Sequence, residues 1–77
     1  MQLQAANADV HYVCALISLF PGAYSPEDLV RELKDYRKNV HDRSNPAKAS
    51  TVVLDMLRDG LVAVRRDAGQ ERMYPRD

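Results

Sequence analysis

The chain has a single cysteine, Cys14, among its 77 residues. An internal disulfide is therefore excluded, and the apolar neighbours of Cys14 indicate a buried thiol in a reducing compartment such as the cytoplasm. The longest apolar run, residues 12–20, is interrupted by Ser18 and is far too short to span a bilayer. The N-terminus lacks the basic region of a signal peptide. We therefore expect a soluble cytoplasmic protein with no membrane partner.

The sequence also lacks the motifs of enzymes and cofactor sites. Its three glycines are scattered, so no glycine-rich loop can hold a phosphate. His11 and Cys14 are three residues apart, which matches neither the CxxC nor the HxxxH spacing of zinc sites. No arrangement pairs a nucleophile with a base. We expect a protein that is not an enzyme, with no catalytic residue, no metal and no cofactor.

The chain has no net charge, since eleven Lys and Arg residues balance eleven Asp and Glu residues. Non-specific affinity for nucleic acid comes from neutralised phosphates, so this balance argues against a purely electrostatic nucleic-acid binder. The charge is locally segregated, however. Six basic and three acidic residues lie between Arg31 and Lys48, which gives 6 − 3 = +3 for this segment. Binding to DNA would therefore depend on local basic surfaces.

With 45% hydrophobic and 29% charged residues, the chain has the composition of one small globular domain. We expect this domain to span residues 8–75, with residues 1–7 and 76–77 as loose termini. No repeat, low-complexity segment or internal linker divides it.

Apolar residues at three- and four-residue spacing predict two helices in the first half of the chain. The first spans residues 8–20, is capped by Asn7 or Asp9, and ends at the Pro-Gly pair that follows. The second spans residues 26–39, because a Ser-Pro pair and two acidic residues form a start signal. Its predicted inward face consists of Leu29, Leu33, Tyr36 and Val40. Since the first helix is apolar on more than one side, we expect it to support a homodimer through residues 8–20.

A third helix and a β-hairpin are predicted in the second half. An Asn-Pro pair at positions 45 and 46 opens a helix that ends near Asp59, and Gly60 suits the left-handed conformation that closes it. Residues 61–64 are apolar and include two β-branched valines, and residues 71–74 can form the returning strand. The third helix is predicted to bury Ala49, Val52, Val53, Met56 and Leu57, and to expose Lys48, Thr51, Asp55 and Arg58.

Three helices followed by a hairpin is the element order of a winged helix. Residues 50–62, followed by Arg65, Arg66 and Arg72, resemble the recognition helix and wing of small bacterial and phage winged-helix DNA-binding regulators. This resemblance implies an α+β fold, mostly α-helical, with a C-terminal β-hairpin wing. In that superfamily the start of the third helix enters the major groove and the wing touches the DNA backbone or minor groove. The residues that would contact DNA are Arg43, Lys48, Ser50, Thr51, Arg65, Arg66 and Arg72.

Two functions remain open from the sequence. The leading hypothesis is a small sequence-specific duplex-DNA-binding protein, a phage- or plasmid-type transcriptional regulator that acts as a dimer. The alternative is a winged-helix protein-interaction module, such as an inhibitor, adaptor or complex subunit, that does not bind DNA. A third explanation concerns the wing arginines alone, because long charged side chains on an exposed strand discourage aggregation. A continuous basic strip joining Arg43, Lys48, Arg65 and Arg72 would favour DNA, and an apolar patch rimmed by mixed charges would favour a protein partner.

Overall fold

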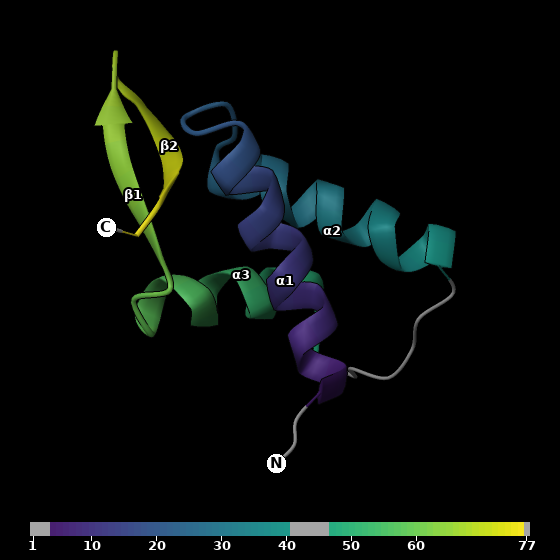
Figure 1. Ribbon diagram of the computed structural model, residues 1–77. Helices are drawn as coiled ribbons and strands as arrows, with labels where there is room; N and C mark the ends of the chain where they lie inside the picture. The colour runs from purple at the N-terminus through teal and green to yellow at the C-terminus, as the bar shows by residue number, and fades with distance from the viewer. Residues whose placement is uncertain (1–3, 41–46, 77) are drawn as a thin grey trace.

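The structure is a computed structural model that describes residues 4–40 and 47–76. Three helices precede a two-stranded antiparallel hairpin (Figure 1). The elements are α1 (Gln4–Leu19), α2 (Pro26–Val40), α3 (Ala49–Arg58), β1 (Val62–Asp67) and β2 (Gln70–Pro75). The predicted fold is confirmed: the chain is α+β, mostly helical, and has the layout of a winged helix with a C-terminal hairpin.

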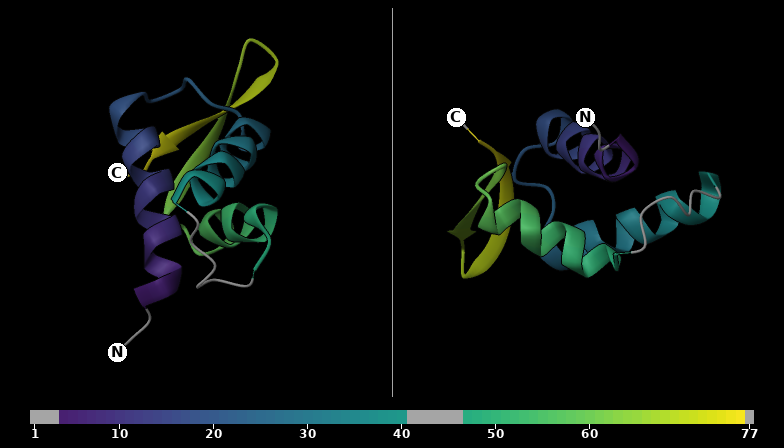
Figure 2. Two further views of the ribbon diagram at one scale, coloured as in Figure 1. Left: turned by 90° about the vertical axis from the view of Figure 1, so that its right-hand side faces the viewer. Right: turned by 90° about the horizontal axis from the view of Figure 1, so that it is seen from below.

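α1 lies on one side of the molecule and packs against α2, α3 and the hairpin (Figure 2). Figure 2 shows α1 along one side of the molecule, with α2 and α3 along the opposite side. The hairpin rises from the end of α3, so that α3 and the hairpin form the two arms of an L (Figure 1). No helix in the described part of the chain is long and apolar enough to cross a membrane.

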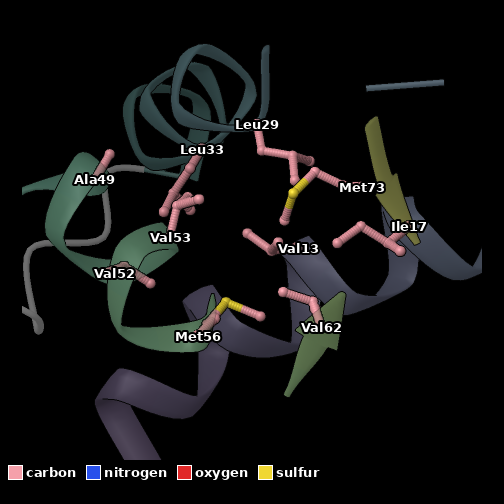
Figure 3. Close-up of a cluster of buried hydrophobic side chains, with 10 residues drawn as sticks. All are labelled: Val13, Ile17, Leu29, Leu33, Ala49, Val52, Val53, Met56, Val62 and Met73. Carbon is pink, nitrogen blue, oxygen red and sulfur yellow. The ribbon is translucent and has the colours of Figure 1, made fainter. Parts of the chain in front are cut away.

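The hydrophobic core receives side chains from all five elements (Figure 3). Burying one Val, Leu, Ile or Met side chain contributes roughly 1.5–3 kcal/mol to folding. The helices and the hairpin therefore stabilise each other through this shared core. The core residues are Val13, Ile17, Leu29, Leu33, Ala49, Val52, Val53, Met56, Val62 and Met73.

Ser25 caps the start of α2, as the Ser-Pro start signal predicts, and Asp28 adds a return bond that was not predicted. The Ser25 hydroxyl accepts a hydrogen bond from the backbone N–H of Asp28 at 3.1 Å. In return, the Asp28 carboxylate accepts one from the backbone N–H of Ser25, also at 3.1 Å. That backbone hydrogen bond holds the pKa of Asp28 below its ordinary value. Two N–H groups that would otherwise lack partners are thus satisfied at the first turn.

Asp9 does not cap α1, contrary to the prediction. The helix begins at Gln4, because the alanines that precede Asp9 are strong helix formers and continue the helix toward the N-terminus. Asp9 is 1% exposed, and its carboxylate accepts a hydrogen bond from Nη2 of Arg37 at 2.6 Å. Nη1 of Arg37 donates to the carbonyl oxygen of Ala47, also at 2.6 Å. One guanidinium group therefore ties α1, α2 and the approach to α3 together.

Three further predictions about the helices are corrected in detail. Val40 is 47% exposed, because it is the last residue of α2 and extends past the core. The predicted start of α3 at positions 45 and 46 lies outside the described residues, but Lys48 has an extended backbone and α3 begins only at Ala49. Leu57 is half-buried and packs at the edge of the core.

The end of α3 follows the prediction closely. Gly60 has a left-handed φ of +77°. Its N–H donates to the carbonyl oxygen of Leu57 at 3.2 Å, and the N–H of Leu61 donates to that of Met56 at 2.9 Å. These two bonds form the motif in which a glycine ends a helix and satisfies its last carbonyl groups. β1 starts directly afterwards and is longer than predicted, so Arg65 and Arg66 are strand residues.

The connection between α1 and α2 lies against β2, a contact that the sequence did not predict. The N–H of Met73 donates to the carbonyl oxygen of Tyr24 at 2.7 Å, and the N–H of Gly22 donates to the carbonyl oxygen of Met73 at 2.9 Å. The outer edge of β2 is therefore occupied at its centre. Among the described residues, β1 has no strand on its other side.

Candidate nucleic-acid interface

The hairpin carries the three predicted wing arginines but brings only two of them, Arg65 and Arg72, to the same face. Arg65 lies directly opposite Arg72, and Arg66 lies opposite Glu71. Because side chains alternate along a strand, Arg65 and Arg72 share one face of the hairpin and Arg66 is on the other. The two faces therefore differ in charge: one has two opposed cations and the carboxylate of Asp67, and the other has the Arg66–Glu71 ion pair.

The face with Arg65 and Arg72 is ordered by neighbouring side chains. The Arg65 guanidinium lies 4.7 Å from the centre of the Tyr74 ring, within the range of a cation–π contact. The Tyr74 hydroxyl donates a hydrogen bond to Asp67, which raises the pKa of Tyr74. Arg72 donates to the side chain of Gln70 at 2.6 Å. Both guanidinium groups are therefore held in place before any ligand binds.

Two like charges directly opposite each other destabilise a hairpin. The cation–π contact of Arg65 and the hydrogen bonds from Arg72 to Gln70 and to the carbonyl oxygen of Ala23 offset this repulsion only partly. The carboxylate on this face, that of Asp67, accepts a hydrogen bond from Tyr74. An oxyanion between the two guanidinium groups would remove the repulsion and add charge-assisted hydrogen bonds. These two arginines are therefore the candidate phosphate contact of the hairpin.

On the other face, Arg66 is already satisfied within the chain. Its Nη2 lies 3.7 Å from Oε2 of Glu71, and its Nη1 donates to the carbonyl oxygen of Gly69 at 3.2 Å. An open cleft of about 640 Å³ separates the hairpin from the start of α2. Its walls include Arg66 and Arg72 together with the acidic residues Glu27, Asp28 and Glu71. This mixed charge makes the cleft a weaker anion site than the face with Arg65 and Arg72.

A second group of predicted residues lies at the first turn of α3. Lys48 and Thr51 are exposed, and Ser50 is half-buried. Lys48 occupies the N-cap position without a side-chain capping bond. Since the N-terminus of a helix has a partial positive charge, Lys48 strengthens the preference of this turn for an anion.

The two basic groups are separated from each other. Lys48 and Thr51 lie at the start of α3, whereas the hairpin extends from its other end (Figure 1). Between them, Arg58 is bonded to Asp55 at 3.0 Å and to Asp59 at 3.3 Å. Among the described residues, the basic strip is therefore not continuous. Arg43, the remaining predicted contact, lies outside the described residues.

Two residues of this surface were missed from the sequence. Leu54 is 63% exposed on the outer side of α3, three residues after Thr51, so helical spacing would have placed it beside Thr51. Tyr74 was predicted only as part of the returning strand, residues 71–74. Tyr74 contacts Arg65 because it is the diagonal neighbour of Arg65 across the hairpin, two residues after Arg72. This relation follows from the strand register, which the sequence did not give.

Comparison with known proteins gives no relative from which a function could be transferred. No protein-family model matches the chain. No curated protein and no solved structure matches it either. The functional argument therefore depends on the geometry of this chain.

Proposed function

We propose that this chain is a small sequence-specific duplex-DNA-binding protein of the regulatory type, which uses α3 and the hairpin. The observation behind the proposal is the direct opposition of Arg65 and Arg72 on one ordered face of the hairpin. The duplex backbone supplies phosphates at regular spacing, and phosphate contacts fix the position of a protein on DNA. This pair is the backbone contact of the hairpin arm.

The other arm reads the bases. A helix of the length of α3 measures about 15 Å at 1.5 Å per residue, and the major groove admits an α-helix. Thr51 presents a hydroxyl that can donate to or accept from a base edge, and Leu54 next to it can contact a thymine methyl group. Lys48 at the start of the helix neutralises a flanking phosphate.

The zero net charge favours selective over non-specific binding. If Lys48, Arg65 and Arg72 each neutralise one phosphate, the logarithm of the binding constant should fall with the logarithm of salt with a slope of about −2.7. Such a shallow slope implies weak binding to random DNA. Base contacts from α3 would then supply most of the discrimination between sites.

The test is binding to duplex DNA selected from a random pool, followed by fluorescence anisotropy with the selected duplex and a scrambled duplex at several salt concentrations. The double variant Arg65→Ala/Arg72→Ala should weaken binding to both duplexes and reduce the salt slope by about 2. Thr51→Ala should change the preference between the two duplexes. Selective binding that is unaffected by the arginine variant would refute the role of the hairpin.

The matched control for the arginine variant is Lys34→Ala/Lys38→Ala, which removes two exposed positive charges from α2. Both double variants change the net charge equally, so a general electrostatic effect would be the same in both. A site-specific effect requires the arginine variant to lose more affinity and more of the salt slope.

The second candidate function is a protein-interaction module, and the surface of α3 favours it. The large exposed side chain of Leu54 lies beside Asp55, and Arg58 is already paired with acidic neighbours. An apolar centre with a rim of paired charges is typical of a protein contact. If the folded protein binds no duplex even at low salt, this function replaces DNA binding.

A further inference from the structure

The hairpin face with Arg65 and Arg72 also carries a carboxylate, that of Asp67. Asp67 follows Arg65 by two residues on β1, so the two side chains share this face and their Cα atoms are about 7 Å apart. Asp67 is also the diagonal neighbour of Arg72 across the hairpin, a separation that long side chains can bridge. A carboxylate in this place can pair with either guanidinium group, and it would then compete with a phosphate for the same hydrogen-bond donors.

The Asp67 carboxylate is held by a tyrosine instead. Across residues 4–40 and 47–76, no ion pair joins Asp67 to another side chain. Its carboxylate accepts a hydrogen bond from the Tyr74 hydroxyl, and this bond raises the pKa of Tyr74, so the hydroxyl stays protonated at neutral pH. The ring of the same tyrosine lies against the Arg65 guanidinium. Tyr74 therefore binds the anion through its hydroxyl and the cation through its ring.

The position of Tyr74 is determined by the connection between α1 and α2. A Cβ atom at Gly22 would lie 2.6 Å from the Tyr74 hydroxyl oxygen, so the lack of a side chain at Gly22 makes room for this hydroxyl. The N–H of Gly22 is hydrogen-bonded to the carbonyl oxygen of Met73, the residue before Tyr74. The tyrosine hydroxyl thus lies between the connection and the Asp67 carboxylate.

We propose that Tyr74 is a positioning residue of the phosphate contact, and that it keeps the Asp67 carboxylate from occupying Arg65 and Arg72. This inference rests on the proposed function, because the ligand of the two arginines is a phosphate of the duplex. Without the tyrosine hydroxyl, the carboxylate pairs with a guanidinium group of its own chain, and the duplex has to displace it. An exposed ion pair is weak, so the loss of affinity should be about two- to fivefold.

The experiment is a double-variant cycle on the full chain, measured by fluorescence anisotropy with the selected duplex. Tyr74→Phe keeps the ring beside Arg65 and removes only the hydroxyl, so it should weaken binding about two- to fivefold. Asp67→Asn should restore the affinity in the Tyr74→Phe background and should have a smaller effect in the wild-type background. If Tyr74 only shaped the hairpin, the two substitutions would act independently and Asp67→Asn would not reverse the loss.

Two matched controls account for the hydroxyl and for the charge. Tyr36→Phe removes the hydroxyl of a half-buried tyrosine that is stacked on Tyr12, and it should leave the affinity unchanged. Asp35→Asn changes the net charge as Asp67→Asn does, at an exposed position of α2. Its effect should be the same in the wild-type and Tyr74→Phe backgrounds, because it acts only through the net charge.

A measurement on the free protein separates this inference from the proposed function. The NMR signals of the arginine Nε–H groups respond to an ion pair with a carboxylate. The signal of Arg65 or Arg72 should shift in Tyr74→Phe and return toward its wild-type position in Tyr74→Phe/Asp67→Asn. If the wild type binds no duplex, the proposed function fails, and signals that shift and return would still support the placement of the carboxylate by Tyr74. Signals that do not move, or duplex binding that Tyr74→Phe leaves unchanged, would overturn the role of Tyr74.

Discussion

Arg37 and the wing arginines are the same residue type in opposite situations. The Arg37 side chain is 19% exposed, and its partner Asp9 is 2% exposed. The Arg66 side chain is 66% exposed, and Arg65 lies on a tyrosine ring at the surface. A buried guanidinium is committed to the fold, because removing its partner leaves a charge without solvent. An exposed one contributes little to the fold and remains available to a ligand.

The largest expected effect is at the buried pair. Arg37→Ala should lower the free energy of unfolding by about 3–5 kcal/mol, because it breaks an ion pair to a carboxylate whose side chain is only 2% exposed. Urea denaturation followed by circular dichroism measures the change. The control is Arg58→Ala, which breaks two exposed ion pairs and should cost no more than about 1 kcal/mol. Similar losses in the two variants would contradict the distinction drawn from burial.

The next effect is at the connection that packs against β2. A Cβ atom at Gly22 would lie 2.6 Å from the Tyr74 hydroxyl oxygen, and φ at Gly22 is +77°. Gly22→Ala should therefore destabilise the domain by about 1–3 kcal/mol through strain and displacement of Tyr74. Gly69→Ala is the matched control, since φ there is +81° but nothing lies within 4 Å of the added atom. The difference between the urea midpoints of Gly22→Ala and Gly69→Ala measures the effect of the contact between the added Cβ and Tyr74. No difference would show that Tyr74 can move aside without cost.

A smaller effect is expected at the start of α2. Ser25→Ala should cost about 1 kcal/mol, because the first turn loses its capping bond. The measurement is the change in the urea midpoint at neutral pH. A loss within experimental error would mean that water satisfies the Asp28 N–H equally well.

The same cap gives a pH dependence with a defined sign. Since the folded pKa of Asp28 is lowered, mainly by the backbone hydrogen bond from Ser25, the unfolded chain binds a proton more readily than the folded one. This contribution is present above the unfolded pKa of about 3.9 and is lost as pH falls through the folded pKa. The stability difference between wild type and Asp28→Asn should therefore shrink in acid. A difference that stays constant as pH falls would contradict this role of Asp28.

The smallest effect on stability is expected in the wing. Arg65→Ala/Arg72→Ala should change the free energy of unfolding by no more than about 0.5 kcal/mol per residue, since the side chains lie at the surface and repel each other. Thermal unfolding followed by circular dichroism provides the measurement. A large loss would show that the arginines are structural, and the comparison with Arg37 would fail.

Local sequence signals predicted most of the fold. The Ser-Pro start of α2, the helical spacing of the core residues of α3, and Gly60 as the end of that helix are each determined by a few neighbouring residues. The predictions failed where distant segments meet. Asp9 looked like a cap because its partner, Arg37, lies on another helix. The segment before α2, which is hydrogen-bonded to Met73, is too short to show a periodic sequence pattern, so these bonds could not be predicted.

The candidate site follows the same division. The presence of three arginines on the hairpin could be predicted, but their pairing could not, because it depends on the position of the turn. A shift of one residue in the register would have moved Arg65 to the other face. The separation of Lys48 from the wing likewise follows from the angle between α3 and the hairpin, which no local signal specifies.

The junction between α3 and β1 is short and hydrogen-bonded. Hydrogen bonds from Gly60 and Leu61 to the last turn of α3 fix the corner, and Val62 is already buried in the core. The angle between the two arms of the L is therefore held by these bonds and by the burial of Val62. Under the proposed function, a duplex that meets both arms has to match a fixed angle between groove and backbone. DNA that differs in groove width or curvature would have to deform in order to bind, so such a protein would select the shape of its site as well as its bases.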